Sequence, residues 1–281
     1  MAPSISTGLS RFCQVGLFHL SSYNERVMTA MLSVKHWVLF EDASLLVLDK
    51  PAGLPIHGDA RQSHEHTAIS LVHQYLEQTQ PQLLREPDFS PAFMHRLDKE
   101  TSGVLVLAKT HEALKNLNRQ LKFKHIKKTY LALVRGELRE IGSIRLRLSK
   151  QFNRKRWKEI MVVDKQSGMH AQTDYCVLEK FDYRWGKFSL IEISPLTGRM
   201  HQIRAHFAAI QHPIVGDVLY GDSALNQQFA HEMKFTRQFL HCTGMKLTHP
   251  QTQMLIEFQA PLATELATLL ERFRAAAQST Q

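Results

Sequence analysis

The order of apolar runs and helical patterns is the feature that most constrains the fold of this chain. Apolar runs of strand length come in groups with helical patterns between them, and the strict alternation of one strand with one helix is absent. Between residues 35 and 275 there is no internal repeat and no linker rich in Gly, Ser or Pro. This order favours an α+β domain with a mixed, largely antiparallel central sheet and flanking helices.

The individual elements are predicted from period, turn residues and caps. Residues 36–53 predict a strand pair, because two apolar runs flank the polar turn "EDAS" and Pro51 and Gly53 end the second run. Thr110 is a suitable N-cap for a predicted helix over 111–123. The other predicted strands are 103–110, 127–138, 172–179, 187–195, 239–250 and 254–261. The other predicted helices are 68–78, 198–210 and 262–277.

The ends of the chain differ in pattern from its middle. Residues 1–34 show no sustained period, so we expect an N-terminal extension that is partly disordered, followed by a folded domain over 35–281. No apolar run approaches transmembrane length, so no membrane partner is expected. Three widely spaced cysteines provide neither a disulfide framework nor a CxxC pair, which predicts a cytoplasmic protein.

Positive charge is concentrated in one segment. The formal net charge is +9 over 281 residues, yet residues 119–158 alone hold 14 Lys/Arg and 2 Glu. The remaining residues hold 21 Lys/Arg and 24 Asp/Glu, a net charge of −3. A contiguous basic segment of this kind is typical of a surface that binds a polyanion. The alternative is a solvated basic face with no ligand.

Four segments in order carry a resemblance to a known family. They read "LDKPAGLPIHG", "HRLDKETSGVLVLAK", "KKTYLALVRG" and "PLTGRMHQIRAHFAAIQHPIVGDVLYGD". Over about residues 37 to 275 the chain resembles the RluA-type family of RNA pseudouridine synthases, and most of all the enzymes that modify large-subunit ribosomal RNA. The resemblance implies the catalytic fold of that family, with an active-site cleft across the sheet, and isomerisation of a uridine in RNA to pseudouridine.

The resemblance also sets expectations about partners. The substrate is structured ribosomal RNA, with transfer RNA as the alternative, and the target uridine is flipped out of the RNA. No cofactor and no metal are expected, and we expect a monomer. Many relatives carry an N-terminal RNA-binding domain like that of a ribosomal small-subunit protein. Because 34 residues are too few for it, we expect that domain to be absent here.

Three residues match the catalytic positions of the family. Asp98 would be the catalytic carboxylate, as a nucleophile, as a base towards the sugar, or as a stabiliser of positive charge at C1′. Arg204 would pair with Asp98 and keep it ionised. Tyr130 would stack on the uracil and assist proton transfer at C5. Without the resemblance, these residues would be a turn-capping Asp, a surface Arg and a core Tyr in a strand.

Further residues are implied in substrate binding. Ile203 would pack on the other side of the base, with ordinary core packing as the alternative. Arg96 would help to displace the target nucleotide, and the alternative is a phosphate contact. A run of lysines before Tyr130 would lead RNA to the pocket. These lysines are Lys122, Lys124, Lys127 and Lys128.

Two other classes of function stay open. One is a metal-dependent RNA hydrolase, because the chain has 16 His and "HEH" at 64–66 lies near His57, although this spacing fits no strong metal template. The other is an RNA-binding module that has lost catalysis. That reading predicts a broken acid, tyrosine or arginine, and all three are present.

Overall fold

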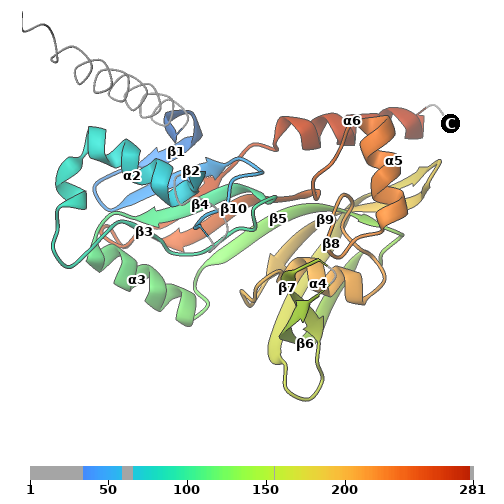
Figure 1. The fold of residues 1–281 in the computed structure, drawn as a ribbon, viewed down its shortest axis with the longest axis horizontal. Helices are drawn as coiled ribbons and strands as arrows, with labels where there is room; N and C mark the ends of the chain where they lie inside the picture. Colours follow the sequence, from blue (N-terminus) through green and yellow to red (C-terminus); the bar gives the residue numbers. More distant parts are fainter. Residues whose placement is uncertain (1–33, 59–65, 155, 279–281) are drawn as a thin grey trace, which may run out of the picture.

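The computed structural model describes residues 34–58, 66–154 and 156–278, which form one mixed sheet flanked by helices (Figure 1). Nine of the strands follow the spatial order β1-β2-β4-β10-β5-β9-β8-β6-β7, while β3 pairs with β4 and β11 pairs with β10. The first six strands are β1 (Val38–Glu41), β2 (Leu45–Lys50), β3 (Ala92–Phe93), β4 (Ser102–Ala108), β5 (Lys127–Arg135) and β6 (Ile141–Asn153). The others are β7 (Lys158–Val163), β8 (Met169–Tyr183), β9 (Gly186–Pro195), β10 (Leu240–Thr248) and β11 (Leu255–Gln259).

The middle of the sheet is held together by β10, which lies between β4 and β5. It is antiparallel to β5 and parallel to β4, where His241 lies opposite Ser102. Among the described strands this is the one parallel pair. A Cβ at Gly103 would lie 2.1 Å from the Cys242 carbonyl oxygen, so the crossing requires glycine there. The predicted mixed, largely antiparallel α+β fold is confirmed.

Helices cover both faces of the N-terminal half of the sheet. Successive residues of β2 point to opposite faces, so Leu46 and Leu48 pack with Val72 and Leu76 of α2, while Leu45 and Val47 join the main core. The main core also receives α3 on this half and α6 on the other. The helices are α2 (Ala68–Thr79), α3 (His111–Lys122), α4 (Gln202–Ala209), α5 (Ser223–Met233) and α6 (Thr264–Gln278), with a short 3₁₀ helix, η2 (Pro81–Leu84).

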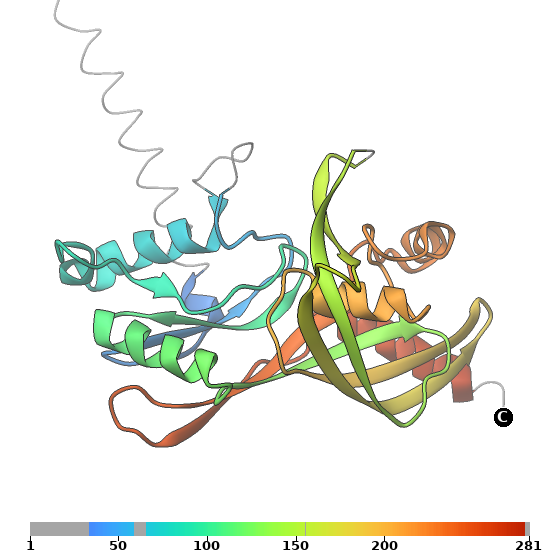
Figure 2. The ribbon, with the colours of Figure 1, turned by 90° about the horizontal axis from the view of Figure 1, so that it is seen from below.

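Most predicted elements are present with small changes at their ends. Thr110 caps α3 as predicted, because its hydroxyl oxygen accepts the Ala113 N–H. The helix predicted over 198–210 begins only at Gln202, because the preceding residue, His201, has a left-handed backbone with φ of 50°. Neither α5 nor the long hairpin of β6 and β7, which projects from the sheet in Figure 2, is predicted from the sequence.

Two expectations from the sequence concern the N-terminal extension and the absence of membrane-spanning segments. The extension predicted over 1–34 lies outside the described residues except for Val34. Within the described ranges, no helix has both the length and the apolar character needed to cross a membrane.

Candidate active site

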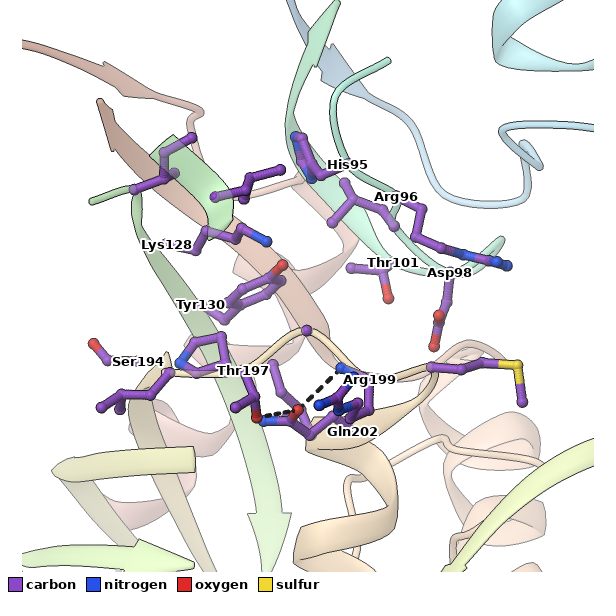
Figure 3. Close-up of a pocket in the computed structure, with 18 of the residues that line it drawn as sticks. His95, Arg96, Asp98, Thr101, Lys128, Tyr130, Ser194, Thr197, Arg199 and Gln202 are labelled. Carbon is purple, nitrogen blue, oxygen red and sulfur yellow. Dashed lines mark hydrogen bonds between the residues drawn. The ribbon is translucent and has the colours of Figure 1, made fainter. Parts of the chain in front are cut away.

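A cleft of about 850 Å³ opens where the two halves of the sheet meet (Figure 3). Three segments provide most of its walls: the loop before β4, the stretch from the end of α3 into β5, and the turn from β9 into α4. All nine residues predicted for the site line it. They are Arg96, Asp98, Lys122, Lys124, Lys127, Lys128, Tyr130, Ile203 and Arg204. The structure therefore brings together residues that lie up to 108 positions apart in the chain, although their catalytic roles stay predictions.

Asp98 is held at the cleft by the turn that precedes β4. The turn is closed by the backbone, since the Thr101 N–H donates to the Asp98 carbonyl oxygen at 3.0 Å. The side chain is therefore not needed as a turn cap. Instead, Asp98 Oδ2 accepts a hydrogen bond of 2.8 Å from Arg204 Nη1, so the expected ion pair is present. The Asp98 side chain is 18% exposed, which leaves it open to a ligand in the cleft.

Arg204 is fixed from behind by a second carboxylate that the sequence analysis did not assign. Its Nε and Nη2 donate to Asp217 Oδ2 and Oδ1 at 2.7 and 2.9 Å, and the Asp217 side chain is fully buried. Burial alone would raise the pKa of Asp217, but the hydrogen bonds and charge of Arg204 hold it below its ordinary value. Arg204 keeps its third nitrogen for Asp98, so the guanidinium bridges two carboxylates.

Tyr130 forms part of the cleft wall from β5. The residue is 7% exposed, and Figure 3 shows its hydroxyl end directed towards Lys128. Burial raises the pKa of the Tyr130 phenol well above its ordinary value, and the Cys242 thiol and Asp98 act in the same direction. The phenol is therefore neutral at physiological pH and can donate a hydrogen bond.

The predicted lysine track lies along the rim of the same cleft. Lys122, Lys124 and Lys127 are exposed, whereas Lys128 is half-buried, and burial lowers its pKa. Lys124 follows the end of α3 with a left-handed φ of 58°, which turns the chain into β5. Arg96 is exposed at the opposite rim and Ile203 is buried in the wall.

The basic segment 119–158 is divided among α3, β5 and the hairpin of β6 and β7. At the hairpin tip, the exposed rings of Phe152 and Trp157 meet edge to face with their centroids 5.1 Å apart. The charge that is contiguous in sequence therefore occupies both the cleft rim and a projecting hairpin.

A buried amide holds the turn from β9 into α4. Gln202 Oε1 accepts from the Thr197 hydroxyl at 2.6 Å and from the Arg199 N–H at 3.1 Å (Figure 3). Its Nε2 donates to the Gln172 carbonyl oxygen and to the Thr173 hydroxyl. A fully satisfied buried amide fixes the loop that bears Ile203 and Arg204. The sequence shows Gln202 only as part of "HQIR", and its partners are visible only in three dimensions.

The histidine-rich stretch is described only in part. His57 and His66 are described, whereas His64 and Glu65 lie outside the described residues. No group of three or more His, Cys, Asp or Glu side chains within 34–58, 66–154 and 156–278 is arranged to hold a metal ion.

Comparison with known proteins gives consistent results. The sequence pattern of a family described as "RNA pseudouridylate synthase" matches residues 44–209. The chain is 37% identical to "Ribosomal large subunit pseudouridine synthase D" of Nitrosomonas europaea, over 84% of this chain and 65% of that protein. It is 35% identical to "Ribosomal large subunit pseudouridine synthase C" of Pasteurella multocida, over 84% of this chain and 68% of that protein. The chain thus spans about two thirds of the length of these relatives.

Solved structures show the same fold. "Human RNA Pseudouridylate Synthase Domain Containing 4" superposes with a TM-score of 0.68 at 23% identity, covering 90% of this chain and 98% of that one. "Human RNA Pseudouridylate Synthase Domain Containing 1" superposes with a TM-score of 0.60 at 26% identity, covering 85% and 94%.

Proposed function

Because the chain belongs to the RNA pseudouridylate synthase family, we propose that it isomerises a uridine to pseudouridine, and that this uridine lies in large-subunit ribosomal RNA. The observation that best supports the reaction is the arrangement of Asp98, Arg204 and Asp217 in the cleft, since it holds one reactive carboxylate in place with a buried counterion. The choice of ribosomal RNA is supported by the names of the relatives, which share 35 to 37% of their aligned residues with this chain.

In this proposal Asp98 acts at the sugar of the target nucleotide. The reaction breaks the bond between N1 of uracil and C1′ and forms a bond between C5 and C1′. Arg204 binds Oδ2 of Asp98, and among the described residues Oδ1 has no hydrogen-bond partner, so Oδ1 is left for the substrate. From there the carboxylate is able to attack C1′, to remove a sugar proton, or to stabilise positive charge at C1′.

Tyr130 would contact the uracil itself. Its ring offers a flat apolar surface for stacking, and Ile203 lines the same cleft as the opposing apolar side chain. Because the raised pKa keeps the phenol protonated, its hydroxyl would donate to the base or return a proton, rather than remove the C5 proton as a phenolate.

The cations on the cleft rim would bind the RNA backbone. Lys122, Lys124 and Lys127 are exposed on one wall, and Arg96 is exposed on the other. A uridine that enters between these walls must leave the RNA stack, and a cation beside the vacated position stabilises the flipped state. The same contacts provide affinity that depends on salt and little on sequence.

Replacement of Asp98 by Asn tests the reaction. The variant keeps shape but loses charge, so we expect turnover below about one hundredth of wild type, with unchanged folding and RNA affinity. Pseudouridine positions should be mapped in total RNA from cells with wild type, Asp98→Asn or no protein. Asp88→Asn, which changes an exposed carboxylate outside the cleft, serves as the control.

The map of pseudouridine positions also distinguishes large-subunit ribosomal RNA from transfer RNA as the substrate. A modified position in large-subunit ribosomal RNA that depends on Asp98 supports the proposal, whereas positions confined to transfer RNA overturn its choice of substrate. Turnover above about one hundredth of wild type in Asp98→Asn argues against an essential carboxylate. Activity lost to a chelator and restored by Zn²⁺ or Mn²⁺ would favour the metal-dependent hydrolase.

A further inference from the structure

His201 lies beside the candidate catalytic carboxylate in an uncommon backbone conformation. It directly precedes α4 with φ of 50°, in the left-handed region, and its side chain makes no capping hydrogen bond to that helix. A left-handed backbone is disfavoured for a non-glycine residue, and such residues concentrate at functional sites. The imidazole instead turns towards Tyr220 on one side and Asp98 on the other.

A chain of hydrogen bonds fixes the orientation of this imidazole. The backbone N–H of Met161, in β7, donates to the Tyr220 hydroxyl oxygen at 2.7 Å. The Tyr220 oxygen lies 3.0 Å from Nδ1 of His201, and its own proton is free to be donated there. Nε2 of the same ring lies 3.9 Å from Asp98 Oδ2. When the imidazole proton is on Nε2, Nδ1 accepts the Tyr220 hydroxyl proton and the Nε2–H faces Asp98.

The electrostatic surroundings favour that neutral form. Burial lowers the pKa of His201, and the nearby cations of Arg204 and Arg96 act in the same direction, while Asp98 and Asp217 oppose them. Burial raises the pKa of the Tyr220 phenol to about 12, so its hydroxyl keeps the proton that it donates. At neutral pH the ring is therefore an uncharged imidazole with one N–H, and the Tyr220 hydroxyl selects the nitrogen that carries it.

From this geometry we infer that His201 is a positioning residue for Asp98, and that Tyr220 sets the tautomer of the His201 imidazole. The separation of 3.9 Å is longer than a hydrogen bond, and such contacts commonly shorten when the substrate closes the site. A donor on Nε2 would hold Asp98 Oδ2 together with Arg204, leaving Oδ1 for the ribose. His201 matters to catalysis only if Asp98 does, so its role rests on the proposed function.

The anchor of this network belongs to the basic hairpin. Met161 is buried in a small cluster with Leu148 of β6 and Ala205 of α4, and Tyr220 packs against the same cluster. The Tyr220 ring also lies under the Arg204 guanidinium, 5.1 Å from its carbon. A shift of the hairpin relative to α4 would therefore move the hydroxyl that orients His201.

Four variants test this role in single-turnover reactions at saturating RNA, measured from about pH 5 to 9. His201→Asn adopts the left-handed backbone more readily than histidine but carries no group at the position of Nε2. His201→Gln places an amide N–H near that position. Tyr220→Phe keeps the ring under Arg204 and removes only the hydroxyl. Tyr183→Phe, in an aromatic cluster with Trp185 and Phe273, is the control.

We expect His201→Asn to slow turnover by about tenfold to a hundredfold, as for a lost hydrogen bond to a charged group, with wild-type RNA affinity and melting temperature. His201→Gln should recover part of this rate. The wild-type rate should fall as acid protonates His201, below the ordinary histidine range, because the imidazolium would add a second cation beside Asp98 and weaken its carboxylate, and both His201 variants should lack this acid limb. Tyr220→Phe should move the limb to higher pH, because Nδ1 then accepts a proton more easily.

Two results would overturn the inference. One is a wild-type rate and pH profile in His201→Asn. The other is a uniform loss of rate with an unchanged profile and a lowered melting temperature, which indicates packing alone. Failure of the proposed function is recognised separately, because wild type would then form no pseudouridine, or Asp98→Asn would form it at the wild-type rate, whatever the His201 variants do.

Discussion

Asp217 should be one of the most costly polar side chains to replace in this fold. Its carboxylate accepts two hydrogen bonds from Arg204 and two more from the backbone N–H groups of Leu219 and Tyr220, at 2.8 and 3.0 Å. In Asp217→Asn an NH₂ group replaces one oxygen. At the Oδ2 position this NH₂ group opposes the Arg204 Nε–H, and at the Oδ1 position it opposes the Arg204 Nη2–H and both backbone N–H groups, so each rotamer leaves buried donors facing each other.

The size of the expected loss of stability follows from the burial of the Asp217–Arg204 ion pair. Asp217 is fully buried and the Arg204 side chain is 8% exposed, so water cannot replace the lost charge. Removal of one partner from a buried ion pair typically costs about 3–5 kcal/mol. Asp98 still neutralises part of the Arg204 charge, so we expect the lower end, about 3 kcal/mol in the free energy of unfolding at pH 7. The assay is urea unfolding followed by circular dichroism and tryptophan fluorescence.

The pH dependence of the stability difference between wild type and Asp217→Asn provides a second test, and the direction of the change is defined. The pKa of Asp217 is lowered in the folded protein from the ordinary value of 3.8. A depressed carboxyl pKa contributes stability that is fully present above the unfolded value and is lost as pH falls through the folded value. The difference between wild type and Asp217→Asn should thus be constant from about pH 5 to 8 and should shrink below about pH 4.

A surface ion pair provides the matched control. Glu159 pairs with Lys150 at 3.2 Å, and both side chains are more than half exposed, so Glu159→Gln should cost less than about 1 kcal/mol. A loss below about 1 kcal/mol in Asp217→Asn, or a loss that does not shrink in acid, would refute the account of a buried, charge-dependent bridge.

Two further predictions concern RNA and the base. Tyr130→Phe should keep RNA affinity, because stacking requires only the ring, and should slow single-turnover product formation by about tenfold or more; wild-type turnover would limit Tyr130 to stacking or packing. Changing Lys122 and Lys124 together to Gln should weaken binding to many RNAs alike and flatten the slope of log K against log salt by up to about 1.4, while the same change at Lys246 should not. Wild-type binding and slope in the double variant would indicate a solvated face.

The sequence predicted the central strands well because their patterns are local. The predicted strand over 103–110 begins with a continuous apolar run at 103–108, and the structure buries every residue of β4 on both faces. Thr110 and the apolar spacing after it predict α3 for the same reason. These signals lie within one element, so no knowledge of its neighbours is needed.

The hairpin of β6 and β7 was not predicted, because its strand pattern coincides with a dense run of basic residues. Residues 144–148 alternate apolar and basic side chains, which is a strand pattern, and the structure buries Ile144 and Leu148 while Arg145 and Arg147 are exposed. The density of charge led to an interpretation as a binding surface, without a secondary structure. Both descriptions apply, because the basic residues occupy one face of a strand.

The residues of the site were predicted from the sequence, but the contacts that hold these residues in place were not. The motifs identify Asp98 and Arg204, yet nothing local indicates that Asp217 lies behind Arg204, or that Tyr220 and a backbone N–H of β7 orient His201. Such contacts join separate elements, and they depend on the sheet being assembled. The sequence contains "HPIVGD" and "VLYGD" as patterns, and only the fold gives them partners.

The position of β10 has a consequence for how the molecule reaches its folded state. The strands β2 and β4 on one side, and β5, β9 and β8 on the other, are made earlier in the chain, but they share a sheet only after β10 enters between β4 and β5. Its pairing of His241 with Ser102 closes a loop of more than a hundred residues, and such distant contacts are slow to form. During synthesis on the ribosome, both walls of the cleft therefore emerge well before the strand that joins them, and nascent chains without β10 expose two unpaired strand edges to other chains.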